Sequence, residues 1–173
     1  NNLVDVDAAV NLIAEFPDQT AFAILKHTNA CGCATADTVK EAYQKAFAAD
    51  TTSAFGGVLV TNQPVDKDAA EEMNSLFFEV LIAPEFTEEA LTVLKGKKNR
   101  ILLCQKMALP GTKMIKTLLN GVIEQDKDLA TESKADFKVV TKVAPTEKEL
   151  DALVFAAKVC KHTKSNTIVL SND

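Results

Sequence analysis

The stretch that decides the fold is Ala21-Phe-Ala-Ile-Leu-Lys-His-Thr-Asn-Ala-Cys-Gly32. Residues 21–25 form a short, almost uninterrupted apolar run, which is typical of a strand buried on both faces of a sheet. The run ends directly in Lys26 and His27. The small residues that follow, among them Gly32, are expected to form a loop that lets a ligand approach the backbone. Open α/β sheets usually hold their ligands at the carboxyl ends of strands, so the lysine and the histidine are predicted to face a ligand.

Composition indicates one folded domain. The chain has 173 residues, of which 47% are apolar, enough to bury a core. Its net charge of −5 disfavours non-specific binding to nucleic acid or to anionic membranes. No apolar run approaches the roughly 20 residues of a membrane-spanning helix, and the first residues lack a signal-peptide pattern. We expect the cysteines to be reduced thiols and not to form disulfides; they are Cys31, Cys33, Cys104 and Cys160. We therefore expect a cytoplasmic protein without a nucleic-acid or membrane partner.

Short apolar strands alternate with amphipathic helices in the first part of the chain. Helices are expected over residues 5–15, 39–47, 65–77 and 87–94, and strands over residues 21–25, 57–60, 80–83 and 101–104. Thr35 or Asp37 is the expected N-cap of the second helix. This alternation predicts an α/β fold of three layers, in which a mostly parallel central sheet carries helices on both faces.

The pattern is looser in the second part of the chain. Strands are expected over residues 122–125, 137–140 and 167–170. A helix is expected to begin at the capping box Thr146-Glu-Lys-Glu149. Basic residues at the end of this helix, including Lys161 and His162, would complement its dipole.

Lys26 and His27 are the leading candidates for chemistry. Histidine titrates near neutral pH, and a neighbouring ammonium can stabilise negative charge that forms on a reacting atom. The chain contains two histidines, so His27 has little competition as an acid–base group. The plainer interpretation is that both residues are simply polar where a strand leaves the core.

Three other segments carry candidate binding groups. Phe55 and Gly56 form either a turn before a strand or a flat platform for a planar ring. Glu79 is either a solvated carboxylate or, if it lies near Lys26, a group that holds a hydroxyl or an amine of a ligand. Asn166 precedes the last expected strand, and its amide can both donate and accept hydrogen bonds.

Metal and phosphate sites are disfavoured. His27, Cys31 and Cys33 are close in sequence, but structural zinc usually takes four ligands in paired spacings, and no second pair is present. The HxE and PCxxC motifs of zinc-dependent nucleobase deaminases are missing. Neither GxxxxGK[ST] nor GxGxxG occurs. We therefore expect no metal site.

Motifs spread over nearly the whole chain point to one family. They are Asn1-Asn-Leu-Val-Asp5, Lys26-His-Thr-Asn-Ala-Cys-Gly32, Glu41-Ala-Tyr-Gln-Lys-Ala-Phe47, Ser53-Ala-Phe-Gly-Gly57, Glu79-Val-Leu-Ile-Ala-Pro84, Glu89-Ala-Leu91, Lys97-Lys-Asn99 and Lys161-His-Thr-Lys-Ser-Asn166. In their order and spacing these segments resemble the transformylase part of the bifunctional purine-biosynthesis family AICAR transformylase/IMP cyclohydrolase.

The resemblance implies an activity and roles for particular residues. The activity is formyl transfer from the co-substrate 10-formyltetrahydrofolate to the 5-amino group of AICAR, in de novo purine (IMP) biosynthesis. By this resemblance His27 is the acid–base residue, Lys26 stabilises the transition state and Asn166 orients the reacting groups. The implied substrate-binding residues are Gly56, Glu79 and Phe55.

The resemblance also implies an architecture. It implies a cytidine-deaminase-like fold without zinc, in which residues 1 to about 128 form a first subdomain and residues from about 129 to 173 begin the next. The family acts as a homodimer that shares its transformylase sites. The cyclohydrolase domain and the later half of the transformylase region are not in this sequence, so the chain alone is expected to have little or no activity.

One departure from the family motif concerns the loop after His27. The usual Lys-His-Asn-Asn-Pro-Cys-Gly has Thr28 and Ala30 here, so the proline that would stiffen the loop is gone.

From the residues alone, two other classes of function remain open: a non-catalytic ligand-binding or scaffold chain, and a zinc-dependent deaminase-like hydrolase. Metal content and binding of AICAR distinguish these classes from a transformylase.

Overall fold

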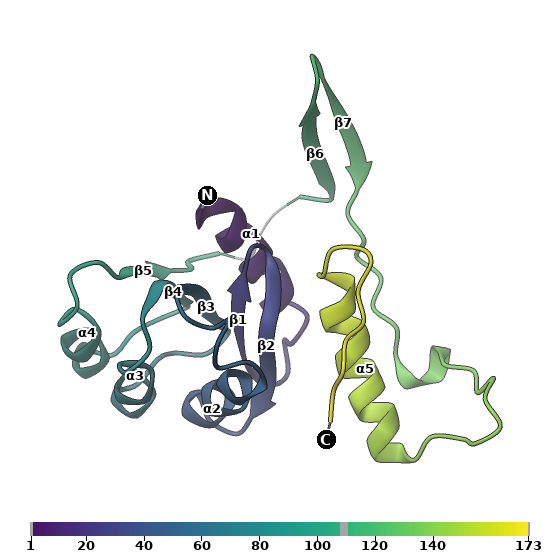
Figure 1. Ribbon diagram of the computed structural model, residues 1–173, viewed down its shortest axis with the longest axis horizontal. Coiled ribbons are helices and arrows are strands. Elements are labelled where there is room, and N and C mark those ends of the chain that lie inside the picture. The colour runs from purple at the N-terminus through teal and green to yellow at the C-terminus, as the bar shows by residue number, and fades with distance from the viewer. Residues whose placement is uncertain (1, 108–110, 173) are drawn as a thin grey trace.

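The computed structural model describes residues 2–107 and 111–172, and the first part of the chain forms a sheet with helices on both faces (Figure 1). The elements of this domain are α1 (Asn2–Ile13), β1 (Thr20–Lys26), β2 (Asn29–Ala36), α2 (Val39–Ala49), β3 (Gly57–Thr61), α3 (Lys67–Met73), β4 (Phe78–Ala83), α4 (Glu88–Leu94) and β5 (Ile101–Cys104). The predicted α/β class and the predicted helical layers are confirmed.

The central sheet is mixed, so the prediction of a mostly parallel sheet is wrong. The strand order is β2-β1-β3-β4-β5, and β1 pairs antiparallel with both β2 and β3, whereas β3, β4 and β5 run parallel. The physical reason lies in two connections: the two residues between β1 and β2 permit only an antiparallel pair, and the crossover through α2 leaves β3 parallel to β2 and so antiparallel to β1. The carboxyl end of β1 therefore lies at the same edge of the sheet as the amino ends of β3 and β4.

The segment expected as a small-residue loop is the edge strand β2, and its small residues have a packing role. A Cβ atom at Gly32 would collide with the carbonyl oxygen of Ala46 in α2. Glycine therefore lets α2 lie directly on the strand. The expectation that this glycine lets a ligand approach the backbone is wrong, because a helix occupies that space.

Alternate side chains of the strands form two apolar layers. One layer joins the sheet to α2, α3 and α4, which lie in a row along one face (Figure 1). It includes Phe22, Ile24, Tyr43, Leu59, Met73, Phe78, Leu81 and Leu94. The other layer joins the sheet to α1. It includes Val10, Leu12, Ile13, Ala23, Leu25, Val58, Val60, Val80 and Ile82.

The helix starts follow from capping side chains. The hydroxyl of Thr38 accepts a hydrogen bond from the Glu41 amide at 3.2 Å, so Thr38 caps α2, and the expectation of Thr35 or Asp37 is wrong. Asp66 caps α3 in the same way. The helix predicted over residues 65–77 is shorter in the structure, because α3 begins only after its cap Asp66 and ends at Met73.

The second part of the chain holds the hairpin of β6 (Lys113–Leu118) and β7 (Gly121–Asp126), the short 3-10 helix η1 (Lys134–Asp136) and the helix α5 (Glu147–Lys161). The hairpin projects away from the sheet domain (Figure 1). The predicted strand at 122–125 is part of β7, whereas β6 was not predicted. The Thr146–Glu149 capping box of α5 is confirmed. Within the described ranges, no helix is long and apolar enough to cross a membrane.

Two predicted strands, residues 137–140 and 167–170, are not strands in the structure. Several of their apolar side chains are exposed to solvent: Val140 and Leu170 are each 92% exposed and Ile168 is 88% exposed. A strand needs a neighbour that pairs with its backbone, and neither segment pairs with another described strand. The predictions are wrong for that reason.

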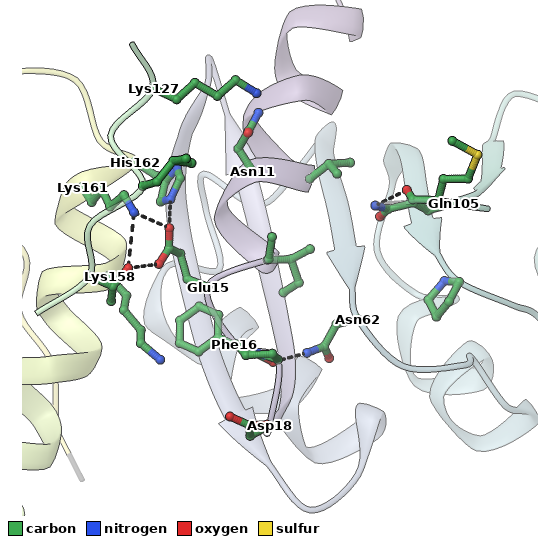
Figure 2. A pocket seen from close by; sticks show the side chains of 18 of the residues that line it. Asn11, Glu15, Phe16, Asp18, Asn62, Gln105, Lys127, Lys158, Lys161 and His162 are labelled. Atoms are coloured by element: carbon green, nitrogen blue, oxygen red, sulfur yellow. Dashed lines mark hydrogen bonds and ion pairs between the residues drawn. The ribbon is translucent and has the colours of Figure 1, made fainter. Parts of the chain in front are cut away.

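Polar contacts around Glu15 attach α5 to the sheet domain (Figure 2). The Glu15 carboxylate lies 2.8 Å from both Lys161 Nζ and His162 Nε2 and accepts a hydrogen bond from Thr131 at 2.7 Å. Lys161 and His162 thus contact a carboxylate as well as lying at a helix end. Burial acts to raise the pKa of Glu15, but the hydrogen bonds that it accepts outweigh burial and hold this pKa below its ordinary value.

The close contact between β2 and α2 gives a first test. Gly32→Ala is expected to lower the free energy of unfolding by about 1–3 kcal/mol, because the new Cβ forces α2 away from the strand. Urea denaturation measures the change. The control is Gly121→Ala, where a Cβ meets nothing within 4 Å and the expected change is below about 0.5 kcal/mol. Equal stability of Gly32→Ala and wild type would contradict this packing.

The contacts of Glu15 give a second test, with a pH signature. A carboxyl whose pKa is lowered by folding stabilises the fold above its unfolded pKa and loses that contribution as pH falls through its folded pKa. Glu15→Gln should therefore lower the free energy of unfolding by about 1.5–3 kcal/mol near neutral pH.

Unfolding titrations of Glu15→Gln and of wild type at several pH values make the measurement. The difference in the free energy of unfolding between the two proteins should shrink as the pH falls below 4.5, the ordinary pKa of a glutamate. Glu85→Gln, at an exposed position, is the control. A difference that does not change with pH would contradict the proposed role of the Glu15 charge.

Candidate functional site

A cavity of about 400 Å³ opens where β1 ends. Its walls come from the first turn of α1, the β1–β2 turn and the amino ends of β3 and β4. The polar residues that line it include Asn2, Asp5, Lys26, His27, Glu79 and Lys164. The cavity exists at this edge because β1 runs opposite to β3 and β4, which brings the end of one strand beside the beginnings of the others.

Lys26 is the last residue of β1, and its ammonium group is held by backbone carbonyls. Its Nζ donates hydrogen bonds to the carbonyl oxygens of Phe55 at 2.8 Å and of Gly56 at 2.9 Å. A lysine ammonium has three N–H donors. One donor is therefore left for a ligand in the cavity.

Gly56 also lines the cavity, and its backbone conformation explains why glycine stands there. It has a φ of +67°, and a Cβ would lie 3.1 Å from Lys26 Nζ. Its amide donates to the Phe77 carbonyl at 2.8 Å. Glycine thus allows the lysine to reach the carbonyls before β3 and leaves the backbone accessible from the cavity.

Glu79 is the second residue of β4, rather than the residue before the strand as expected. The amide of Asn2 donates a hydrogen bond to Glu79 Oε2 at 2.6 Å. Among the described residues, no group donates to the other carboxylate oxygen. That oxygen can therefore accept a hydrogen bond from a hydroxyl or an amine of a ligand.

His27 lies at the tip of the turn between β1 and β2 and is exposed. It lines the cavity together with Lys26. In the part of the chain that the structure describes, no side-chain or backbone group makes a hydrogen bond to its imidazole. The ring nitrogens are therefore open to a ligand, with one able to donate and the other to accept in the neutral form.

Two of the predicted site residues do not line this cavity. The Phe55 ring is 63% exposed and lies 5.1 Å from the ring of Phe77, so only the backbone carbonyl of Phe55 takes part, through Lys26. Asn166 is exposed and is not among the lining residues. Lys164, two residues before it, does line the cavity, and its backbone amide donates to the Asn29 side chain at 3.0 Å.

Sequence reasoning missed the contribution of α1. Asn2 contacts Glu79, and the Asp5 carboxylate accepts a hydrogen bond from the Thr28 amide at 2.6 Å. These residues are three positions apart on a helix, which places them on one face. This three-residue spacing was the feature of the sequence that could have indicated that the two residues act at the same place.

A larger cavity, of about 910 Å³, lies at the carboxyl ends of β3, β4 and β5 (Figure 2). None of the predicted site residues lines it. Much of its polar lining already has structural partners: Glu15 contacts Lys161 and His162, and the Asn62 amide donates to the Phe16 carbonyl at 2.6 Å. The smaller cavity, with an unpaired imidazole and a free ammonium donor, is the better candidate for chemistry.

The thiols near this site are not activated. Burial raises the pKa of Cys33 to about 12, and burial, with the charge of Asp50, also raises the pKa of Cys31. The Cys31 thiol donates to the Ile24 carbonyl at 3.4 Å.

Within residues 2–107 and 111–172, no group of three or more His, Cys, Asp or Glu side chains is placed to hold a metal ion.

Comparison with known proteins gives a consistent result. Residues 1–173 match the family described as AICARFT/IMPCHase bienzyme. The chain is 55% identical over 171 residues to the bifunctional purine biosynthesis protein PurH of Bacteroides thetaiotaomicron, and 46% identical over 175 residues to the protein of the same name from Leuconostoc citreum. These alignments cover 99% and 100% of this chain and 34% of each relative.

A comparison of structures is much weaker. A protein described as a formate dehydrogenase accessory protein, from Desulfotalea psychrophila, aligns with 51% of this chain and 47% of its own at a TM-score of 0.43 and 7% identity, which is too low to assign a fold. The sequence matches extend over the whole chain, which spans about a third of the length of the curated relatives it matches. On these matches the chain belongs to the AICARFT/IMPCHase bienzyme family.

Proposed function

We propose that this chain carries the formyl-transfer chemistry of a bifunctional AICAR transformylase/IMP cyclohydrolase in purine biosynthesis, in the cytoplasm. The reaction moves a formyl group from 10-formyltetrahydrofolate to the 5-amino group of AICAR. One observation supports the proposal most: Lys26, His27, Gly56 and Glu79, which lie far apart in sequence, line a single cavity. Membership of the family supports the choice of substrates.

His27 has the role of the base in this proposal. The 5-amino group of AICAR is conjugated with its ring and is a poor nucleophile, so removal of its proton during attack accelerates the reaction. A positioned base typically contributes about 10²–10⁴-fold. As the amine nitrogen bonds to the formyl carbon, the imidazole takes the proton. When the bond to the folate nitrogen breaks, that proton passes to the leaving nitrogen.

Lys26 has the role of electrostatic stabiliser. Attack on the formyl carbon places negative charge on the formyl oxygen, and a fixed donor aimed at that oxygen lowers the barrier. Two of the three donors of the ammonium are used by the Phe55 and Gly56 carbonyls. The group is therefore held in place before the reaction, and its third donor is available to the formyl oxygen.

Gly56 and Glu79 have the role of binding AICAR. The glycine lets the substrate approach the backbone, and the free oxygen of Glu79 accepts a hydrogen bond from a polar group of AICAR. Asn2 supports this role because it holds the other carboxylate oxygen at 2.6 Å. Phe55 contributes through its backbone carbonyl, which holds the Lys26 ammonium at 2.8 Å.

Asn166 and the folate belong to a larger assembly in this proposal. Asn166 does not line the cavity of its own chain, so we propose that it orients reacting groups in the partner subunit of a homodimer.

We also propose a zinc-free, cytidine-deaminase-like architecture, with a first subdomain that ends near residue 128 and a second that begins there.

His27→Ala tests the proposed base. In the complete polypeptide that carries this chain, we expect formyl transfer to fall at least about 10²-fold, because the amine loses its proton acceptor. AICAR binding, measured by calorimetry, should persist and serves as the control for an intact cavity. Near-normal turnover by this variant would contradict the assignment.

Lys26→Met tests the proposed stabiliser while it keeps the length of the side chain. Loss of an oxyanion donor typically lowers kcat by about 10²–10³-fold. We expect a fall in kcat of this order, measured by steady-state formyl transfer. Lys45→Met, an exposed lysine on α2, is the matched control and should retain wild-type kcat. Equal kcat values for the two variants would refute the role.

A further inference from the structure

We propose that Asp5 is a positioning residue, whose carboxylate holds the turn between β1 and β2 in the conformation that presents His27 to the cavity. This inference rests on the proposed function and adds a residue to it. Its basis is a single short hydrogen bond from a strained turn to a helix that is packed firmly on the sheet.

The turn that carries His27 has an unusual backbone. Lys26 pairs with Asn29, so His27 and Thr28 are the two residues that join the strands. They have φ values of 50° and 67°. A two-residue hairpin with positive φ at both positions normally uses Asn-Gly or similar residues, because a Cβ is unfavourable there. Histidine and threonine both carry a Cβ, and Thr28 is also β-branched, so this turn needs outside support.

Asp5 supplies that support. Its Oδ1 accepts a hydrogen bond from the Thr28 amide at 2.6 Å, in a partly buried position. A hydrogen bond to a charged acceptor is about twice as strong as a neutral one. The bond reaches the second residue of the turn directly, so it favours the positive φ of Thr28 and, through the chain, the orientation of His27.

The other contacts of the turn offer less support. The Thr28 hydroxyl donates to the His27 carbonyl at 2.6 Å, which is a contact inside the turn. The Lys164 amide donates to the Asn29 side chain at 3.0 Å, but that segment lies in the exposed tail after α5. Asp5 instead belongs to α1, whose residues Val10, Leu12 and Ile13 are buried against the sheet. The turn is thus tied to the core of the domain.

A plainer role for Asp5 is to stabilise the dipole of α1, because acidic residues in the first turn of a helix do so. The two roles differ in what can replace the carboxylate. If Asp5 acts on the turn, glycine at position 28 makes it dispensable, because glycine adopts positive φ without strain. If Asp5 acts on the helix, glycine in the turn has no effect.

The experiment uses four variants of the complete polypeptide: Asp5→Ala, Asp5→Asn, Thr28→Gly and the double variant Asp5→Ala/Thr28→Gly. Asp7→Ala, exposed on the same helix, is the control. We expect Asp5→Ala to lower kcat about 10- to 100-fold with little change in KM, because the base is misplaced. Asp5→Asn, whose amide oxygen can still accept, should retain most of the activity. The double variant should recover most of it as well.

Hydrogen exchange of the Thr28 amide makes the test independent of activity. In Asp5→Ala this amide should exchange at least about tenfold faster than in wild type, whereas Asp7→Ala should leave it unchanged. Unchanged exchange in Asp5→Ala overturns the inference, whatever the activity. A loss of kcat that Thr28→Gly does not rescue also overturns it. If wild type transfers no formyl group yet the exchange changes as expected, the positioning role stands and the proposed function fails.

Discussion

The two-residue connection between β1 and β2 is the constraint on which the rest of the structure depends. So short a connection permits only an antiparallel pair, and it turns the chain by way of two residues with positive φ, His27 and Thr28. The same constraint makes the candidate base the tip of a hairpin and puts the candidate ammonium at the end of the preceding strand. The reactive pair is therefore a consequence of how the sheet begins.

The direction of β1 decides which other residues join the site. Since β1 runs antiparallel to β3, its carboxyl end meets the residues that precede β3 and begin β4, namely Gly56 and Glu79. In an all-parallel sheet these residues would lie at the opposite edge from Lys26. The first turn of α1 then closes the cavity and contacts two of its parts, Glu79 through Asn2 and the His27 turn through Asp5. Helix α1 thus links packing on one face of the sheet to the geometry of the site.

Much of the fold could be predicted from the sequence where apolar periodicity is strong. Strands β1, β3 and β5 follow directly from it, whereas the start of α5 follows from its Thr146–Glu149 capping box. Strand β2 could not be predicted, because its small residues reflect contact with α2, and that contact is not local in sequence. The strands expected at 137–140 and 167–170 failed for the opposite reason, since an apolar run forms a strand only beside a pairing partner. For the site, residue chemistry identified Lys26 and His27, and the family resemblance implied Gly56 and Glu79. Asn2 and Asp5 share one face of α1, but what that face contacts is known only once α1 is seen to lie across the sheet.

We propose that the cavity at the end of β1 binds AICAR for chemistry at His27, and a crystal structure of the complete polypeptide with AICAR bound can decide this. We expect the 5-amino nitrogen within about 2.6–3.2 Å of a ring nitrogen of His27, with the Lys26 ammonium on the same side of the ligand. AICAR bound instead in the larger cavity at the carboxyl ends of β3, β4 and β5, or with its amine turned away from His27, would rule this binding mode out.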